Sequence, residues 1–348
     1  MINNLLLHAC RREPTERTPV WLMRQAGRYL PEYRAIRAKT DFLTLCKTPE
    51  LAAEVTIQPV EILGVDAAIV FSDILLVPEA MGMELVLDES TGPRFITPVR
   101  TRNDVTALTV KDPQTSLRFV LETIERTKRA LNGRVPIIGF CGSPWTLAAY
   151  MLEGKGTKDF HSAKRMMLDD PDTVTALLEK LSLMVRLHLE AQIAAGVDIV
   201  QIFDTWGGIL SPDHYKKWSL DLMFKVVSSM QKNGTPVIMF SKGANHCLKE
   251  IAEIGADVVS IDWTIDIADV CNLIGDKVAI QGNLDPSVLF ASPERIRQEV
   301  RSILRKYGNR SGHIFNLGHG IAPDVPVEHA RSLVRSVKED SPVYHKGL

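Results

Sequence analysis

Two arginines, four residues apart, are the first feature of this chain that points to chemistry. Arg24 and Arg28 follow the apolar run 20–23 directly, separated by residues 25–27 with a glycine among them. A guanidinium presents five donors in a planar fork that fits a carboxylate or a phosphate. Two such forks directly after a strand predict an anion-binding site. The alternative is that both arginines lie at the surface or pair with internal acids.

Four other side chains have types that suit a polar ligand: Asp73, Tyr150, Thr205 and His319. Asp73 ends an apolar run, so we expect its carboxylate to be partly desolvated, unless it only caps the backbone of the next loop. His319 stands between two glycines and either donates to a ligand carboxylate or bonds to backbone. The Tyr150 hydroxyl either reaches the cavity or belongs to the core. Thr205 also fits a helix N-cap.

The sequence lacks the residue patterns that several other reaction types require. Ser143 is followed by Pro144, so it is no G-x-S-x-G nucleophile, and H-E-x-x-H is absent. His246 and Cys247 are adjacent, and neighbouring side chains diverge on a helix or a strand, so a zinc site would need distant partners. The sequence therefore predicts no metal site.

Eight runs rich in Val, Ile and Phe must position these residues. Their apolar character is nearly continuous, which is typical of parallel strands covered on both faces. The runs are 19–24, 65–73, 134–142, 197–204, 235–243, 256–263, 278–285 and 313–320.

Helical segments alternate with these runs. Pro at the first turn and Gly just past the end predict helices over 49–63 and 171–195, and others between Pro212 and Gly234 and between Pro293 and Gly308. Eight strands alternating with helices, without a linker, favour a single α/β domain over residues 1–348, a (β/α)8 TIM-type barrel. The alternative is a doubly wound sheet, but no G-x-G-x-x-G follows a strand.

In such a barrel the active site lies at the C-terminal strand ends. Polar residues gather at those ends while the strand bodies are apolar. They are Arg24, Asp73, Cys141 with Ser143, Asp204 with Thr205, Ser241 with Lys242, Asp262, Asn283 with Asp285, and Asn316 with His319.

Two segments depart from a minimal barrel. Residues 81–99 predict a β-hairpin insertion with its turn near 90–93. The glycine-rich residues 153–157 predict either a lid or a plain mobile connection.

Composition limits the partners. The 348 residues carry a net charge of -1, with 45% hydrophobic and 24% charged residues, which is typical of a soluble globular protein and argues against nucleic-acid and polybasic membrane binding. No run has eighteen apolar residues and no signal peptide is evident, so we expect a cytoplasmic protein. Five scattered cysteines are expected to be reduced. The N-terminal segment is locally basic, with Arg11, Arg12, Arg17, Arg24, Arg28, Arg34 and Arg37.

Seven motifs carry a family resemblance. From about Leu5 to about Val337 the sequence resembles the uroporphyrinogen decarboxylase family. The motifs are PVWLMRQAGRYLPEYR (19–34), FSDILLVP (71–78), GFCGSPWTLAAYMLEG (139–154), FDTWGG (203–208), IDW (261–263), QGNLDP (281–286) and NLGHG (316–320).

The resemblance implies a (β/α)8 barrel, usually a homodimer, that works without metal or organic cofactor. It implies decarboxylation of the four acetate arms of uroporphyrinogen III to give coproporphyrinogen III in porphyrin and haem biosynthesis. Asp73 and Arg24 are the implied catalytic residues, although a guanidinium with a pKa above about 12 is a poor acid. The implied substrate-binding residues are Arg24, Gln25, Ala26, Gly27, Arg28, Arg37, Asp73, Tyr150, Thr205 and His319. Thr205 stands where some relatives have serine, and the hydroxyl is kept.

Two other functions remain open at this stage. A methyltransferase on the same barrel would need zinc on a spaced His and Cys set, which the sequence does not offer. A non-catalytic tetrapyrrole-binding protein would bind the same ligand without turnover.

Overall fold

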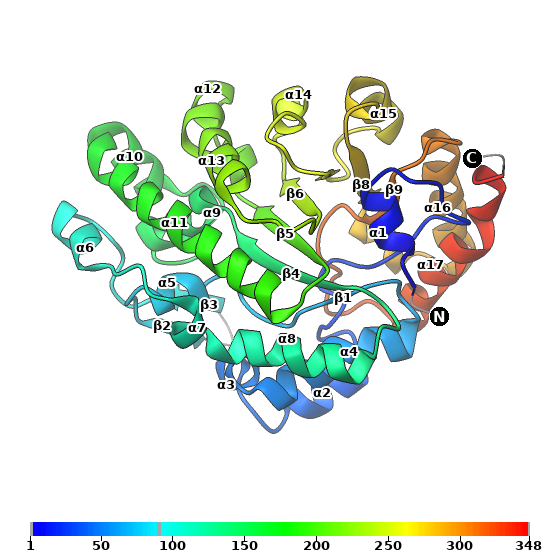
Figure 1. Ribbon diagram of the computed structural model, residues 1–348, viewed down its shortest axis with the longest axis horizontal. Helices are drawn as coiled ribbons and strands as arrows, with labels where there is room; N and C mark the ends of the chain where they lie inside the picture. Colours follow the sequence, from blue (N-terminus) through cyan, green and yellow to red (C-terminus); the bar gives the residue numbers. More distant parts are fainter. Residues whose placement is uncertain (1–2, 89–91, 347–348) are drawn as a thin grey trace.

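A ring of parallel strands surrounded by helices forms the molecule (Figure 1). The computed structural model describes residues 3–88 and 92–346. Seven strands pair in parallel in the order β1-β4-β5-β6-β7-β8-β9. They are β1 (Ala68–Ile69), β4 (Ile137–Gly142), β5 (Ile199–Asp204), β6 (Val237–Ser241), β7 (Val258–Ser260), β8 (Ala279–Leu284) and β9 (His313–Leu317). Each lies within one of the predicted runs.

The remaining predicted run, 19–24, joins β9 to β1 and closes the ring without forming a regular strand. Val20 makes a single parallel bridge to Phe315, and its carbonyl accepts the Asp66 N–H at 2.8 Å. The ladder stops there because Pro19 has no N–H, and because the Val20 N–H donates to the Asp66 carboxylate at 2.9 Å. The predicted strand 19–24 was too long, since only Val20 forms a bridge, but the (β/α)8 architecture holds.

Long helices cover the outside of the ring, and several begin and end at the predicted signals. Helices α4 and α11 start at a proline and end before Gly64 and Gly196, both left-handed. The helix predicted between Pro212 and Gly234 is instead α12, a π-helical turn over 216–220, and α13. The principal outer helices are α4 (Pro49–Leu63), α8 (Arg118–Leu131), α11 (Pro171–Ala195), α12 (Pro212–Tyr215), α13 (Asp221–Ser229), α15 (Ile267–Ile274), α16 (Pro293–Tyr307) and α17 (Val327–Asp340).

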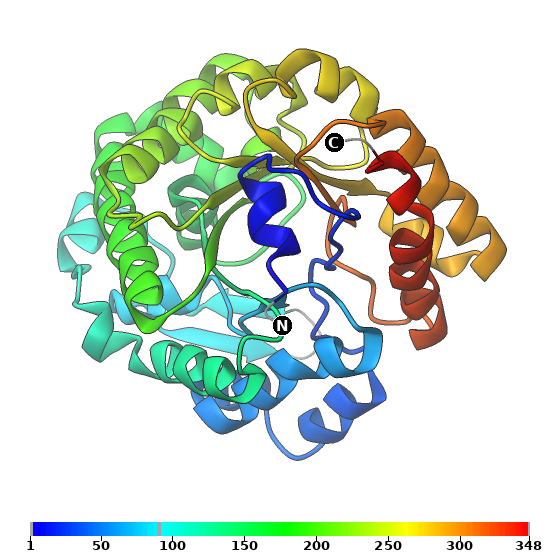
Figure 2. The ribbon, with the colours of Figure 1, turned by 45° about the vertical axis from the view of Figure 1, so that its right-hand side comes forward.

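Shorter helices connect these elements. They are α1 (Leu5–Cys10), α2 (Pro31–Arg37), α3 (Phe42–Lys47), α5 (Leu76–Ala80), α6 (Arg102–Ala107), α7 (Pro113–Ser116), α9 (Pro144–Glu153), α10 (His161–Asp169) and α14 (Leu248–Ile251). Helix α1 lies across one end of the ring (Figure 2). This is the end where the strands begin, because Arg12, just after α1, donates to the carbonyl of Asp276, which precedes β8. We call the opposite end, at which the strands finish, the open end.

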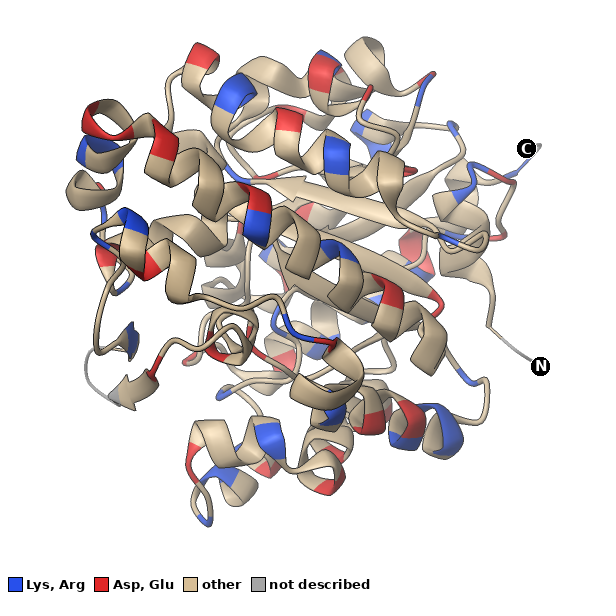
Figure 3. Cartoon of the chain, turned by 60° about the vertical axis from the view of Figure 1, so that its left-hand side comes forward, with Lys and Arg blue, Asp and Glu red and all other residues tan. Residues whose placement is uncertain are grey.

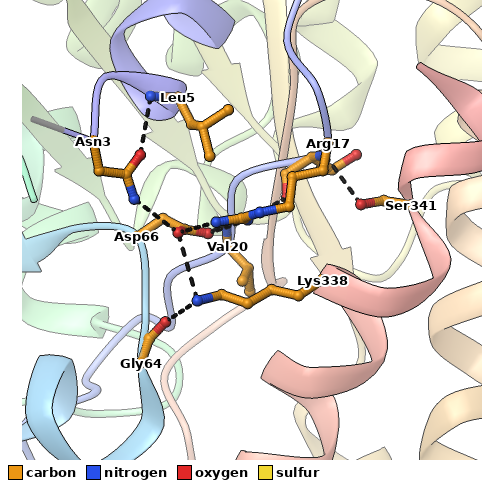
Figure 4. Close-up of polar contacts among 9 residues, drawn as sticks. Asn3, Leu5, Arg17, Val20, Gly64, Asp66, Lys338 and Ser341 are labelled. Atoms are coloured by element: carbon orange, nitrogen blue, oxygen red, sulfur yellow. Dashed lines mark hydrogen bonds and ion pairs between the residues drawn. The ribbon is translucent and has the colours of Figure 1, made fainter. Parts of the chain in front are cut away.

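Asp66 ties this closed end together (Figure 4). Its carboxylate is buried and accepts two hydrogen bonds from the Arg17 guanidinium, at 2.7 and 2.6 Å. Asn3 donates to it at 3.1 Å, and Lys338 of α17 lies 3.7 Å away. One carboxylate thus links the N-terminal segment, the first predicted strand, β1 and the last helix.

The barrel interior contains polar side chains as well as apolar ones. The Trp21 indole N–H donates to the side-chain oxygen of Gln281 at 2.9 Å, and the Gln281 amide donates to the Ser260 hydroxyl at 2.9 Å. All three residues are buried. Because they come from separate parts of the ring, these contacts cross-link the inside of the barrel.

Strands β2 (Leu85–Asp88) and β3 (Gly92–Phe95) pair antiparallel where the sequence predicts a hairpin. Gly92 and Pro93, predicted in the turn, lie in β3, and residues 89–91 are outside the described range. The hairpin lies against the glycine-rich loop, since the Phe95 N–H donates to the Gly154 carbonyl at 2.7 Å. That contact and a bridge between Arg94 and Lys155 hold the start of the loop.

Charged residues of both signs are spread over the outer helices and loops (Figure 3). Among residues 3–88 and 92–346, no helix has the length and apolarity that crossing a bilayer requires. The strand bodies, in contrast, are almost entirely buried.

Candidate active site

Asp73 lies just past β1, at the end of the barrel where the strands finish. One carboxylate oxygen accepts the Leu75 N–H at 2.8 Å, so the predicted loop-capping role is present. The side chain remains half-buried. Burial raises the pKa of the Asp73 carboxyl, while the Leu75 N–H and Arg24 oppose this shift. The Asp73 carboxylate therefore caps a loop, and it also borders the site with a pKa above its ordinary value.

Arg24, the last residue of the 19–24 segment, lies within electrostatic reach of Asp73. Its φ of 63° is left-handed, which turns the chain sharply after Met23. A Cβ added at Gly320 would lie 2.3 Å from Arg24 Cδ, so the arginine stem lies against this glycine. Burial raises the pKa of Asp73 and of Tyr150 and lowers that of His319, and the Arg24 charge acts to lower the pKa of all three. Within the described part of the chain, no carboxylate forms an ion pair with Arg24.

In the turn after Arg24, the Gln25 side chain bonds to the protein backbone, and the groups left for a ligand are backbone N–H donors. Gln25 is fully buried, and its amide donates to the Ala67 carbonyl at 2.9 Å and accepts the Leu22 N–H at 3.1 Å. In residues 3–88 and 92–346, no hydrogen bond uses the N–H groups of Ala26, Gly27 and Arg28. Gln25 thus fixes the turn, while the next three N–H groups are available to an anion.

Arg28 and Arg37 differ in the exposure of their side chains and in the contacts that they make. Arg28 is exposed, and its carbonyl accepts a hydrogen bond from Arg34 at 2.9 Å. Arg37 is half-buried at the end of α2 and donates to the Thr40 carbonyl. Burial raises the pKa of the Cys46 thiol, Asp73 adds to this shift and Arg37 opposes it. Arg37 and Asp73 thus both act on the same thiol, and part of the Arg37 fork is already engaged.

The two glycines that flank His319 each lie close to another residue, because neither has a side chain. Arg24 lies against Gly320, and a Cβ at Gly318 would lie 2.5 Å from the Trp263 backbone nitrogen. Burial, then Arg24 and Lys242, lower the pKa of His319 to about 3. The imidazole is consequently neutral at physiological pH and has both a donor and an acceptor nitrogen.

Tyr150 and Thr205 come from α9 and from the segment after β5. The half-buried Tyr150 ring contacts Phe160 and Trp206, with centroids 5.9 and 6.1 Å apart, and Asp73 acts on the pKa of its hydroxyl. The turn that follows Thr205 begins after Trp206 and has no side-chain cap, so the N-cap alternative does not apply. Both residues follow the C-terminal end of a strand, Tyr150 after β4 and Thr205 directly after β5.

Comparison with known proteins identifies the family. A model described as Uroporphyrinogen decarboxylase (URO-D) matches residues 1–340. The chain is 52% identical to the uroporphyrinogen decarboxylase of Chloroherpeton thalassium over 349 residues, covering 99% of each chain. It is also 52% identical to that of Nitrosococcus oceani over 348 residues, covering 99% of this chain and 98% of the relative.

The chain belongs to the uroporphyrinogen decarboxylase family.

The fold is shared more widely than the family. A methyltransferase from Methanosarcina mazei superposes with a TM-score of 0.83 at 22% identity, covering 97% of this chain and 98% of that one. At this identity the likeness concerns the fold alone. In this uroporphyrinogen decarboxylase family member, Cys247 is buried and His246 exposed. Within the described residues, no three His, Cys, Asp or Glu side chains cluster in a way that could hold a metal.

Sequence reasoning missed an aromatic row below the site. Phe140, Phe203 and Phe240 follow one another around the barrel at 5.6 and 6.0 Å, and His319 continues the row 6.2 Å from Phe240. Phe140 and Phe203 are half-buried, so the row, which we call the aromatic floor, presents apolar surface next to His319. The signal was present in the sequence, because each Phe occurs near the end of its strand, but apolar residues there were interpreted as core.

Sequence reasoning also gave no role to Asp204, the last residue of β5. Its buried carboxylate accepts hydrogen bonds from Ser143 at 2.6 Å, Thr146 at 3.2 Å and Ser241 at 2.8 Å. Burial raises its pKa while these hydroxyls lower it. In this family member Asp204 thereby joins the ends of β4, β5 and β6 to the start of α9, which carries Tyr150.

Proposed function

We propose that this chain is a uroporphyrinogen decarboxylase, which removes carbon dioxide from the four acetate arms of uroporphyrinogen to give coproporphyrinogen. The observation that carries the proposal is full-length family similarity together with one site in which Arg24 lies within electrostatic reach of Asp73, Tyr150 and His319. Cations suit the acidic arms, the aromatic floor suits a large ring system, and a central carboxylate suits pyrrole N–H groups.

The chemistry needs an electron sink. Protonation of the ring carbon next to the one that bears the arm creates an iminium-like cation that is conjugated with the arm-bearing carbon. Loss of carbon dioxide then moves the C–C electron pair into a double bond between that carbon and the former arm carbon, which neutralises the iminium. A second proton at the former arm carbon then leaves a methyl group, while the first proton leaves the ring carbon. Each arm thus exchanges carbon dioxide for a proton, with no change of oxidation state that would call for a redox partner.

Asp73 is the proposed stabiliser of that cation. A unit charge 4 Å away contributes about 4 kcal/mol at an effective dielectric near 20. That energy corresponds to roughly a thousandfold in rate. Because the positive charge develops only during reaction, the interaction strengthens in the transition state and therefore accelerates the step.

The other proposed roles follow from the chemistry of each side chain. Arg24, Arg28, Arg37 and the free N–H groups of Ala26 and Gly27 bind the acidic arms, with Gln25 holding their turn. Tyr150, Thr205 and the neutral His319 supply hydrogen bonds to the macrocycle. We assign Arg24 to binding first, because its guanidinium gives up a proton reluctantly.

We also propose a homodimer in the cytoplasm, as the family resemblance implies. Light scattering of the purified chain tests the assembly: a mass near twice 38.7 kDa is expected, and a monomer at micromolar concentration contradicts it.

The deciding experiment is anaerobic incubation of the purified chain with uroporphyrinogen and no additive, followed by chromatography of the oxidised porphyrins. We expect stepwise loss of carboxylates to the four-carboxylate product. Tight binding without any loss would support the non-catalytic alternative, and stoichiometric zinc by elemental analysis without decarboxylation would support the methyltransferase.

A further inference from the structure

Lys242 stands at the open end of the barrel, immediately after β6. Its N–H donates to the Asp204 carbonyl at 3.2 Å, and its carbonyl accepts the Gly208 N–H at 2.9 Å. These bonds fix its backbone beside the segment that carries Thr205. Its ammonium lies 5.7 Å from the centroid of the Trp263 ring, and the side chain is half-buried. The position of this lysine is therefore set by the barrel and not by a mobile loop.

Trp263 connects Lys242 to His319. A Cβ at Gly318 would lie 3.0 Å from Trp263 Cε3, so the indole lies against the residue before His319. On the other side, Arg24 lies against Gly320. His319 therefore has two cations near it: Arg24, which lies against Gly320, and Lys242, which lies over the Trp263 ring that contacts Gly318.

Neither cation has an acidic partner within residues 3–88 and 92–346. Lysines elsewhere on the surface do: Lys277 pairs with Glu253 at 2.8 Å, for example. The buried Asp262 acts on His319, as Lys242 does, but its carboxylate accepts the Gly243 N–H at 2.6 Å and the Thr264 N–H at 2.8 Å. The nearby acid is thus satisfied by neutral donors, and the charge of Lys242 is left for another anion.

We propose that Lys242 is a further substrate-binding residue, whose ammonium holds a carboxylate arm of the macrocycle near His319, separate from the arm that Arg24 holds. The inference rests on the proposed function and extends it. Two cations near one neutral imidazole bind two arms of the same ring and so fix its rotation in the site. Because an arm held by Lys242 keeps its charge while another arm reacts, Lys242 contributes equally to the ground state and the transition state of that step.

The test compares kinetic constants of the full-length chain and its Lys242→Met and Lys242→Arg variants with uroporphyrinogen under anaerobic conditions. We expect Lys242→Met to raise KM about tenfold, as loss of one charge-assisted contact would, with kcat within about twofold. Lys242→Arg keeps the charge and should restore most of the affinity. The matched control is Lys277→Met, which removes the same charge just before β8, at the closed end of the barrel, and should leave KM unchanged.

A second readout follows His319 by NMR. Its ring faces Arg24, Lys242 and Asp262, and removal of Lys242 leaves one cation fewer to oppose protonation, so its pKa should rise above about 3 in Lys242→Met. If Lys242 only stabilised the fold, a variant that still folds would show neither the rise in KM at constant kcat nor the rise in the His319 pKa. If Lys242→Met does not fold, Lys242→Gln carries the same test.

Three outcomes would overturn the inference: an unchanged KM, a fall in kcat without a rise in KM, or an equal rise in KM for Lys277→Met. The failure of the proposed function is distinguishable, since the unmodified chain would then show no turnover at all.

Discussion

At the scale of single residues, Asp73 combines a stability cost with the catalytic role that we propose for it. Burial disfavours the charged form of its carboxylate, and the proposed mechanism uses that charge to stabilise a developing cation. In Asp73→Asn, the amide oxygen can still accept the Leu75 N–H. We therefore expect kcat to fall roughly a thousandfold with little change in KM, as measured by anaerobic turnover. Unchanged kcat would remove Asp73 from the mechanism.

The same variant has a pH-dependent stability. Because the folded pKa of Asp73 lies above its ordinary value, the unmodified chain loses stability as pH rises through the folded pKa. Asp73→Asn lacks this loss, so its melting temperature should be equal to or above that of the unmodified chain at pH 8. The advantage should shrink toward pH 4. A lower melting temperature at pH 8 would contradict the burial argument.

Gly320 provides a second residue-scale test. A Cβ there would lie 2.3 Å from Cδ and 2.7 Å from Cγ of Arg24, and these atoms can move only by displacing the guanidinium. We expect Gly320→Ala to raise KM severalfold while the melting temperature changes little, because a flexible side chain yields more easily than backbone. A Gly234→Ala control has no atom within 4 Å of the added Cβ, although its left-handed φ adds some strain. Normal KM in Gly320→Ala would mean that Arg24 does not need its present position.

At the scale of elements, the site depends on how three strand ends are joined. Asp204 collects hydroxyl donors from the start of α9 and from β6, and the Tyr215 hydroxyl of α12 donates to Ser241 at 2.9 Å. The loop after β5 is compressed onto this cluster, since a Cβ at Gly207 would lie 2.2 Å from the Asp204 carboxylate. These contacts set the position of Thr205 and of the helix that carries Tyr150.

Replacing the acceptor should loosen all of these elements together. We expect Asp204→Ala to lower the free energy of unfolding by about 3 kcal/mol, because buried hydroxyls lose their acceptor. It should also reduce kcat/KM. Asp204→Asn keeps one acceptor oxygen and should be the milder variant in both respects. Urea unfolding and turnover assays measure the two effects, and an Asp204→Ala variant as stable as the unmodified chain would contradict this role.

At the scale of the whole molecule, the two ends of the barrel hold different clusters. The closed end holds α1 and the Asp66 cluster, which joins segments from Asn3 to Lys338 (Figure 4). The open end holds Asp73, Arg24 and His319. A change at the closed end should therefore affect folding and leave the chemistry intact.

Asp66→Asn tests this separation. Loss of a buried carboxylate leaves Arg17 without its bidentate partner, and we expect the free energy of unfolding to fall by about 3 kcal/mol, with kcat unchanged. The folded pKa of Asp66 is lowered, chiefly by Arg17 against the effect of burial. Its stabilising contribution is therefore present above the ordinary aspartate pKa and is lost as pH falls through the folded value. The stability difference from the unmodified chain should shrink in acid, and a constant difference would contradict the ion-pair explanation.

The sequence by itself determined which segments form the barrel. Continuous apolar runs specify strands buried on both faces, and Pro and Gly mark helix ends, because these signals act within a few residues of the chain. The position of Asp73 and His319 at strand exits followed from the same reasoning.

Only the tertiary structure decided which partners those residues meet. The Asp66 carboxylate takes the Val20 N–H and shortens the first strand, and Gln25 is buried against Ala67 instead of facing a ligand. Lys242 becomes a neighbour of His319 through Trp263. These outcomes depend on packing between segments tens to hundreds of residues apart, and side-chain packing across a barrel leaves no local periodicity from which it could be predicted.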